Sequence, residues 1–162
     1  MEVSDEERFL ALVREHQRII HRLVGLYAAD RDERKDLEQE TLLQAWKGWR
    51  SYRGDAKFST WLYRICLNTI LTQKRRPNVV QRHDGLEHLP HVGDDPGRRN
   101  DEAQRLQLAM RQLPETDRAL LSMHLDGFDH SEIAEVIGIT GNHVGVKLHR
   151  IKTRLTEILQ PH

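Results

Sequence analysis

The chain has 162 residues, of which 38% are hydrophobic, 6% aromatic and 31% charged. Basic and acidic residues number 25 each, so the formal net charge is zero at pH 7. Its apolar runs are far shorter than the roughly 20 residues that cross a bilayer, which argues against membrane insertion. The acidic N-terminal stretch lacks the apolar part of a secretory signal. The single cysteine, Cys66, excludes an internal disulfide, and we expect it to be a small buried residue of a cytoplasmic protein.

The zero net charge conceals an uneven distribution. Residues 47–76 hold eight basic residues and one acidic residue, a net charge of +7, and residues 145–162 carry +3. Residues 1–46, 77–104 and 105–144 are each net acidic. Two separated basic zones with acidic neighbours are typical of a protein that contacts phosphates at two places and a different partner elsewhere.

The first half of the chain shows the apolar periodicity of helices. From Glu6 to Tyr27, apolar residues recur every three or four positions, which predicts an amphipathic helix. A second helix is expected from about Glu33 to Trp49. The predicted buried stripe of this second helix comprises Leu37, Leu42, Ala45, Trp46 and Trp49. The predicted outward row comprises Asp36, Gln39, Glu40, Leu43 and Lys47.

A turn, a third helix and a linker follow. Gly54 and Asp55 mark a turn within the sequence SYRGDAKFS. Ser59 is the expected N-cap of a helix that stops before Pro77. Residues 77–103 lose all periodicity and hold three of the five prolines, which predicts a flexible linker. Fully extended, a linker of this length reaches at most about 90 Å.

Two further helices are expected beyond the linker. One should end before Pro114, and the next should begin near Pro114 and end at Gly127, because proline suits a helix start and glycine a helix end. The sequence therefore predicts an all-α protein. It should contain two small helical domains, residues 1–76 and 104–162, joined by the linker.

The C-terminal sequence HSEIAEVIGITGNHVGVKLHRIKTRL has the pattern of two short helices with a tight turn between them. Asp129 and Glu132 have the spacing of a capping box. Gly138 suits the end of the first short helix, and Thr140 is the expected N-cap of the second. The buried stripe of the second short helix should comprise Val144, Leu148, Ile151 and Leu155.

This pattern is typical of a helix-turn-helix, whose second helix enters the major groove of DNA. The alternative is an ordinary helical hairpin with a solvated basic tail. Gly145 lies within the second helix, where it costs about 1 kcal/mol relative to alanine. It is either a weakness of the helix or a point at which the backbone approaches DNA.

Two blocks of the sequence resemble a sigma factor of bacterial RNA polymerase, of the extracytoplasmic-function (ECF) type of the sigma-70 family. Residues 36–76, which begin DLEQETLLQAW, resemble region 2, and residues 113–155, which begin LPETDRALL, resemble region 4. The resemblance implies a non-enzymatic protein without a cofactor. Such a protein binds core RNA polymerase, recognises the −10 and −35 promoter elements and helps to open the DNA for transcription initiation.

The resemblance also implies roles for three groups of residues. The outward row of the second helix would bind core polymerase through Asp36, Gln39, Glu40 and Leu43. The loop and third helix would bind the −10 element through Tyr52, Arg53, Asp55, Lys57, Trp61 and Arg64. The last helix would bind the −35 element through His143, Val146, Lys147, His149 and Arg150. An anti-sigma factor is an expected further partner.

Alternatives stay open at this point. The outward row could be a plain solvated face, and Trp61 could be a core residue. A two-domain helix-turn-helix regulator that binds operator DNA independently is the main rival function, although it leaves the charge of +7 over residues 47–76 unexplained. An enzyme or a metal protein is disfavoured, because the ten histidines show no metal-site spacing and no phosphate-binding loop occurs.

Overall fold

The computed structural model describes residues 3–75 and 101–160. Every regular element in these two ranges is helical, which confirms the all-α prediction. The described residues fall into two compact units, one in each range. The predicted linker lies outside the described residues, apart from its last three positions, 101–103, which already form the start of a helix.

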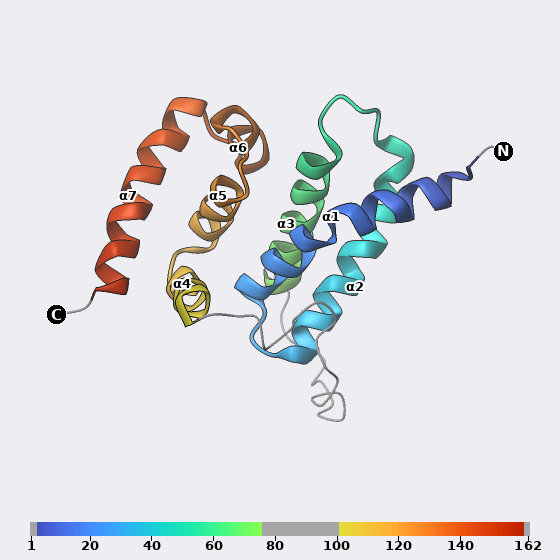
Figure 1. Ribbon diagram of the computed structural model, residues 1–162. Coiled ribbons are helices and arrows are strands. Elements are labelled where there is room, and N and C mark those ends of the chain that lie inside the picture. Colours follow the sequence, from blue (N-terminus) through green and yellow to red (C-terminus); the bar gives the residue numbers. More distant parts are fainter. Residues whose placement is uncertain (1–2, 76–100, 161–162) are drawn as a thin grey trace. The chain divides into compact units, whose positions relative to one another are not determined.

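The first unit is a bundle of three α-helices (Figure 1). Its elements are α1 (Asp5–Tyr27), α2 (Arg31–Gly48), the short 3-10 turn η1 (Trp49–Ser51) and α3 (Phe58–Arg75). Ser4 and Asp30 cap the first two helices, since each side chain accepts a hydrogen bond from a backbone N–H of the first turn. The α1–α2 connection and the loop before α3 lie at opposite ends of the bundle (Figure 1).

The third helix begins at Phe58, two residues earlier than an N-cap at Ser59 would place its start. The backbone N–H of Trp61 donates to the carbonyl oxygen of Lys57 at 3.0 Å, which closes the first turn. Ser59 therefore lies inside the helix, and its prediction as the N-cap was wrong. The helix ends at Arg75, close to the predicted stop.

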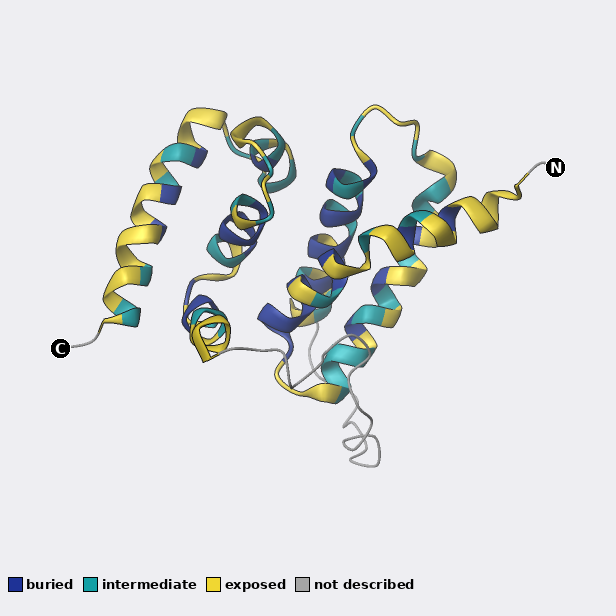
Figure 2. Ribbon diagram, in the orientation of Figure 1, coloured by how far each residue is buried: buried dark blue, intermediate teal, exposed yellow. Residues whose placement is uncertain are grey.

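The core of the first unit is formed by one stripe from each helix, drawn dark blue in Figure 2. On α2 this stripe is Leu37, Thr41 and Ala45, at spacings of four. Leu42 and Trp46, which were predicted to be buried, are 40% and 41% exposed. The prediction was wrong because each lies one residue, about 100° of helix rotation, beyond the true stripe. A fully buried Thr41 takes the central position instead.

The second unit contains four helices. They are α4 (Asp101–Arg111), α5 (Glu115–Leu125), α6 (His130–Ile137) and α7 (Gly141–Leu159). Pro114 is the N-cap of α5, and Gly127 follows the C-cap of this helix with φ of +92°, a conformation that glycine adopts without strain. The predicted ends of α5 are therefore confirmed to within a residue.

The last two helices form the predicted helix-turn-helix. Asp129 and Glu132 make the complete capping box at the start of α6. Gly138 ends this helix with φ of +87°, and its N–H donates to the carbonyl oxygen of Ala134 at 2.8 Å. The inner side of α7 is the dark stripe in Figure 2, formed by Val144, Leu148 and Ile151. Each such apolar side chain stabilises the unit by about 1.5–3 kcal/mol when fully buried.

Candidate nucleic-acid and protein interfaces

The outward row of α2 forms a polar surface with an apolar edge. Asp36 and Gln39 are exposed, Glu40 is half-buried, and Leu43 is 45% exposed, so the predicted row does face outward. The side-chain amide of Gln44 donates to Glu40 Oε1 at 2.9 Å and holds that carboxylate in place. Since Leu42, Leu43 and Trp46 are all exposed nearby, the surface suits a protein partner that offers both polar and apolar groups.

A hollow of about 280 Å³ lies beside this row. Its lining combines one end of α3 with α2, through Asp36, Leu37, Gln39, Glu40 and Gln73. Three of the four predicted protein-binding residues therefore line a single depression. A convex partner surface, such as a helix with amide or basic side chains, would fit it.

Six of the nine Phe, Trp and Tyr residues gather at one end of the first unit. Trp49 is at the centre: its ring centroid lies 5.5 Å from that of Phe9 and 5.7 Å from that of Tyr52. Tyr52 and Trp61 approach to 5.0 Å, and both are half-buried. Trp61 thus packs against other rings yet keeps part of its surface open to solvent.

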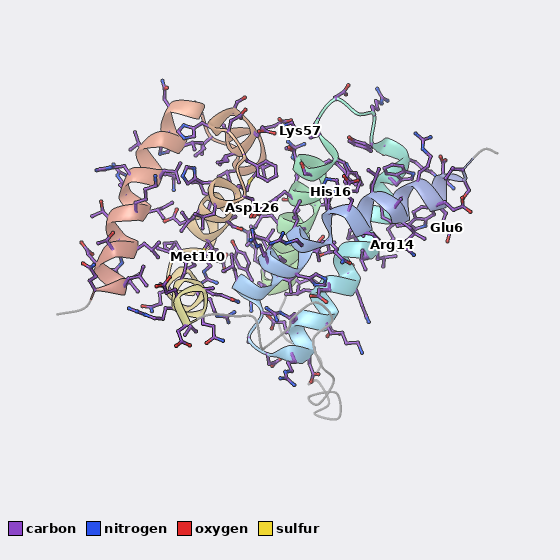
Figure 3. All side chains as sticks on the ribbon, viewed as in Figure 1. Glu6, Arg14, His16, Lys57, Met110 and Asp126 are labelled. Atoms are coloured by element: carbon purple, nitrogen blue, oxygen red, sulfur yellow. The ribbon has the colours of Figure 1, made fainter. Side chains whose placement is uncertain are left out.

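The loop before α3 carries exposed charged side chains next to residues of this cluster in the sequence. The hydroxyl of Tyr52 donates to the carbonyl oxygen of Ala56 at 2.8 Å, and Gly54 has φ of +80°, so the turn is closed as its sequence predicts. Lys57, labelled in Figure 3 at the start of α3, is exposed. Arg53 and Asp55 are also exposed, while Arg64 is half-buried on α3. Aromatic rings beside a basic rim can stack and hold unpaired bases of single-stranded DNA.

Trp49 is the residue of this site that the sequence analysis did not identify. It was assigned to the buried stripe of α2, whereas the structure places it in η1 as the common neighbour of Phe9, Tyr52, Phe58 and Trp61. The signal in the sequence was the crowding of five aromatic residues within positions 46–61.

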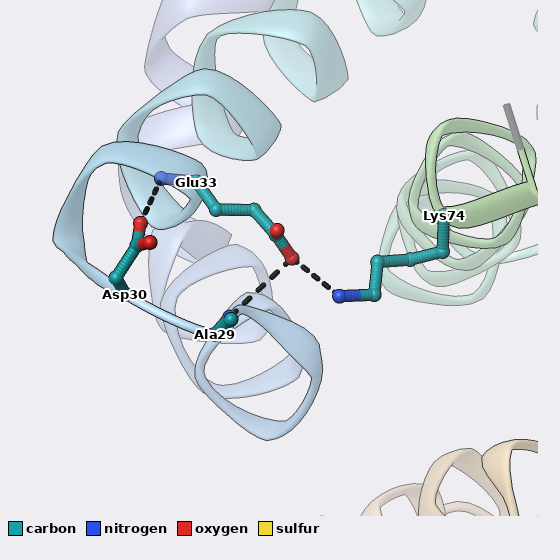
Figure 4. A network of polar contacts seen from close by, with 4 residues as sticks. All are labelled: Ala29, Asp30, Glu33 and Lys74. Atoms are coloured by element: carbon teal, nitrogen blue, oxygen red, sulfur yellow. Dashed lines mark hydrogen bonds and ion pairs between the residues drawn. The ribbon is translucent and has the colours of Figure 1, made fainter. Parts of the chain in front are cut away.

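The opposite end of the bundle is fixed by a network around the start of α2 (Figure 4). Glu33 Oε1 lies 2.6 Å from Lys74 Nζ on α3 and accepts a weaker hydrogen bond from the N–H of Ala29 at 3.4 Å. His21 Nδ1 on α1 lies 2.9 Å from Glu38 Oε1. These contacts hold α2 against both neighbours. They also pair Lys74, one of the eight basic residues in positions 47–76, within the protein itself.

In the second unit, four of the five predicted DNA-binding residues lie on the exposed face of α7. Thr140 Oγ1 accepts a hydrogen bond from the N–H of His143 at 3.2 Å and so caps the helix as predicted. The exposed four are His143, Val146, His149 and Arg150. Lys147 is half-buried instead, and its Nζ lies 3.4 Å from Asp117 Oδ1 on α5.

Gly145 is turned toward α6. A Cβ atom added to this glycine would lie 3.7 Å from Cε1 of the His130 ring, an ordinary van der Waals contact. Gly145 is therefore half-buried on the side of α7 that faces α6, and it does not belong to the exposed face of the helix. Of the two explanations that the sequence left open, this position favours a weakness of the helix.

Two further observations concern other kinds of site. Among residues 3–75 and 101–160, no three His, Cys, Asp or Glu side chains come together as metal ligands would. No helix in this described part combines the length and the apolar character that a bilayer crossing requires.

Comparison with known proteins adds independent information. Residues 12–78 match the family model of sigma-70 region 2, and residues 103–155 match that of sigma-70 region 4. The ECF RNA polymerase sigma factor SigM of Mycobacterium tuberculosis is 30% identical, over 96% of this chain and 79% of that protein. The RNA polymerase sigma-H factor of Pseudomonas aeruginosa is 29% identical, over 98% of this chain and 89% of that protein.

A solved structure shares the fold. It is the sigma factor RpoE of Bartonella quintana in complex with the anti-sigma factor NepR. The TM-score is 0.72, with 22% sequence identity, and the likeness covers 97% of this chain and 98% of that one.

Proposed function

Because the chain belongs to the ECF sigma factors of the sigma-70 family, we propose that its three candidate surfaces divide the work of promoter recognition among them. As a sigma factor, the protein binds core RNA polymerase, directs recognition of the −35 and −10 promoter elements and promotes DNA opening for transcription initiation. The family acts as transcription initiation factors and not as enzymes.

The observation that carries the proposal is the combination of two different nucleic-acid surfaces in one chain. The first unit presents aromatic rings beside a basic rim, which suits single-stranded DNA. The second presents a capped helix-turn-helix with an exposed outer face, which suits a duplex major groove. A protein that must hold both a closed and an opened stretch of the same DNA needs both.

The outward row of α2 is the proposed contact with core polymerase. Asp36, Gln39 and Glu40 supply charge and amide groups around the hollow, and Leu43 supplies an apolar anchor. The same exposed row is where an anti-sigma factor could compete with polymerase. We infer that the protein works in the cytoplasm, where core polymerase is found.

The loop and the start of α3 form the proposed −10 surface. Tyr52 and Trp61 offer stacking faces, and Arg53, Lys57 and Arg64 offer positive charge to the backbone of the opened strand. Asp55, at the exposed turn, would accept a hydrogen bond from an extruded base. On α7, the exposed His143, Val146, His149 and Arg150 are the proposed −35 contacts, whereas Lys147, half-buried and paired with Asp117, is left out of this set.

We further propose that the functional division follows the domain boundaries expected from the sequence, with residues 1–76 serving core polymerase and the −10 element and residues 104–162 serving the −35 element. Residues 77–103 would then act as the tether between them. The two promoter elements lie more than one helical turn of DNA apart, and one turn is about 34–36 Å. A tether that reaches at most about 90 Å is long enough to span more than that distance.

The direct experiment is in vitro transcription from a genomic library with purified core polymerase, with and without this chain. We expect new transcripts with defined start sites that depend on the chain, and co-purification of the chain with core. Absence of both would overturn the function. Tight, dimeric binding to a specific duplex without polymerase would instead favour an operator-binding regulator, the rival that the family comparisons disfavour.

A matched pair of variants tests the polymerase surface. Leu43→Asp should sharply weaken co-purification with core, because it places a charge at the apolar anchor. Leu10→Asp on α1 is the control, since Leu10 is 40% exposed, close to the 45% of Leu43. Equal binding by the two variants would remove the assignment of the α2 row.

A further inference from the structure

The ion pair between Lys147 and Asp117 joins the proposed −35 helix, α7, to the first turn of α5. Lys147 Nζ lies 3.4 Å from Asp117 Oδ1. The two side chains are only 30% and 21% exposed, so both charges are partly removed from water. A carboxylate consequently stands at the edge of a surface that would approach DNA phosphates.

Helix geometry separates Lys147 from its neighbours. At about 100° of rotation per residue, Lys147 lies on the flank of α7, between the buried stripe of Val144 and Leu148 and the exposed face of Val146 and Arg150. The flank faces α5, which carries Asp117. The lysine is thus directed along its own domain and not outward with the proposed contacts.

We propose that Asp117 is a positioning residue that holds the Lys147 ammonium back from DNA, so that Lys147 makes no phosphate contact. The proposal rests on the proposed function of α7 as the −35 helix. If Lys147 moved to a phosphate, it would leave a half-buried carboxylate unpaired beside the DNA backbone, which is unfavourable.

The consequence concerns specificity. A lysine–phosphate contact raises affinity for every DNA sequence alike, whereas base contacts distinguish one sequence from another. Withholding Lys147 therefore keeps binding to unrelated DNA low. Discrimination is left to the exposed side chains of α7, among them His149 and Arg150.

The experiment measures how binding to a promoter fragment by the holoenzyme depends on salt, by fluorescence anisotropy. Asp117→Asn keeps the size of the side chain and removes its charge, which releases Lys147. We expect the slope of log affinity against log salt to steepen by about 0.9, the value for one added phosphate contact. Over a fourfold rise in salt, the variant should then lose about 3.5-fold more affinity than the unmodified protein. Discrimination against a scrambled −35 element should fall.

Four comparison variants isolate the role of Lys147. Lys147→Gln alone should leave the slope unchanged, and Lys147→Gln combined with Asp117→Asn should restore the original slope. Asp117→Glu keeps the charge and should behave as the unmodified protein. Glu157→Gln makes the same charge change in the exposed Arg154–Glu157 pair on α7 and should not steepen the slope. Thermal unfolding checks that each variant is folded.

Three results would overturn the inference. An unchanged slope in Asp117→Asn would mean that Asp117 does not hold Lys147 back from a phosphate. A loss of about 0.9 in slope on Lys147→Gln alone would mean that this lysine already contacts a phosphate. A slope that stays steep in the double variant would assign the effect to the field of Asp117 itself. The same variants are compared on unrelated duplex with the full chain alone at low salt. This second measurement tests the role of Lys147 even if the chain directs no transcription. Failure of this inference can therefore be distinguished from failure of the proposed function.

Discussion

Thr41 and Cys66 meet at the centre of the first unit, where both side chains are fully buried. The hydroxyl of Thr41 donates to Cys66 Sγ at 3.9 Å. Burial raises the pKa of the Cys66 thiol to about 12, against an ordinary value of 9.0. The thiol is therefore protonated and inaccessible in the folded protein, as expected for a cysteine that serves as a small apolar residue.

We predict that the native protein does not react with an aromatic disulfide reagent at neutral pH. The thiolate is the reactive form, and both burial and the raised pKa suppress it. In denaturant, one equivalent of thiol should react at once. Rapid stoichiometric reaction of the folded protein, monitored by absorbance, would show that Cys66 is exposed.

The same pKa predicts the pH dependence of stability. The unfolded thiol loses its proton above pH 9.0, whereas the folded thiol keeps it until about pH 12, so the folded state binds more protons in this interval. The contribution of Cys66 is fully present below pH 9.0 and declines as pH rises toward 12. Urea unfolding of the protein and of Cys66→Ala from about pH 8 to about pH 11 should show their difference in unfolding free energy shrinking.

Gly145 provides a third prediction at the scale of one residue. Its backbone has no positive φ, and a Cβ atom would make only ordinary contact with His130. Gly145→Ala should therefore stabilise the second unit by about 1 kcal/mol in chemical unfolding. Gly138→Ala is the contrasting control, because φ of +87° at Gly138 makes the same change destabilising. If Gly145→Ala instead weakened promoter binding without loss of stability, close approach to DNA would be the better explanation.

At the scale of the element, the helix-turn-helix depends on its caps. Asp129 Oδ1 accepts from the N–H of Glu132 at 2.8 Å, and Glu132 Oε1 accepts from the N–H of Asp129 at 3.1 Å. Asp129→Ala should cost the second unit about 1 kcal/mol, because it leaves a backbone donor of α6 without its partner. Ser131→Ala, two residues further along the chain and exposed, is the control and should cost less.

The distribution of tryptophan makes this prediction specific to one unit. Trp46, Trp49 and Trp61 are the three tryptophans, and all lie in the first unit. Tryptophan fluorescence therefore reports unfolding of the first unit, while circular dichroism reports both. Asp129→Ala should shift the transition seen by circular dichroism and leave the fluorescence transition in place. A parallel shift of both would mean that the two units unfold together.

Local sequence signals predicted the ends of α6 and α7 well. Features that depend on packing between helices, such as which side chains of α2 are buried, could not be predicted in this way. Caps and turn glycines act over three or four residues, so Asp129, Gly138 and Thr140 were identified correctly from sequence. The burial of Trp46 depends on which stripe of α2 meets its neighbours, and hydrophobicity alone misplaced it by one residue. The pairing of Lys147 with Asp117 spans 30 positions, and no periodicity indicates it.

For the whole molecule, the important quantity is the arrangement of charge. Net charge is zero, and part of the basic charge is paired internally, as at Lys74 with Glu33 and Lys147 with Asp117. Since acidic segments lie next to each basic zone in the sequence, we propose that the free chain offers little attraction to DNA phosphates. The acidic row of α2 would then serve twice, by contacting polymerase and by keeping the free protein off DNA.

These two roles predict opposite effects of one change. Asp36→Asn combined with Glu40→Gln removes two negative charges, so the isolated chain should bind unrelated DNA more tightly at low salt while its binding to core polymerase weakens. Glu6→Gln combined with Glu7→Gln removes the same charge from the exposed first turn of α1 and should raise DNA binding but leave core binding intact. Anisotropy measures the first effect and co-purification the second. Equal loss of core binding in both double variants would mean that polymerase senses only the overall charge of the chain. Tight promoter binding by the unmodified chain alone at moderate salt would contradict the proposal that acidic residues keep the free protein off DNA.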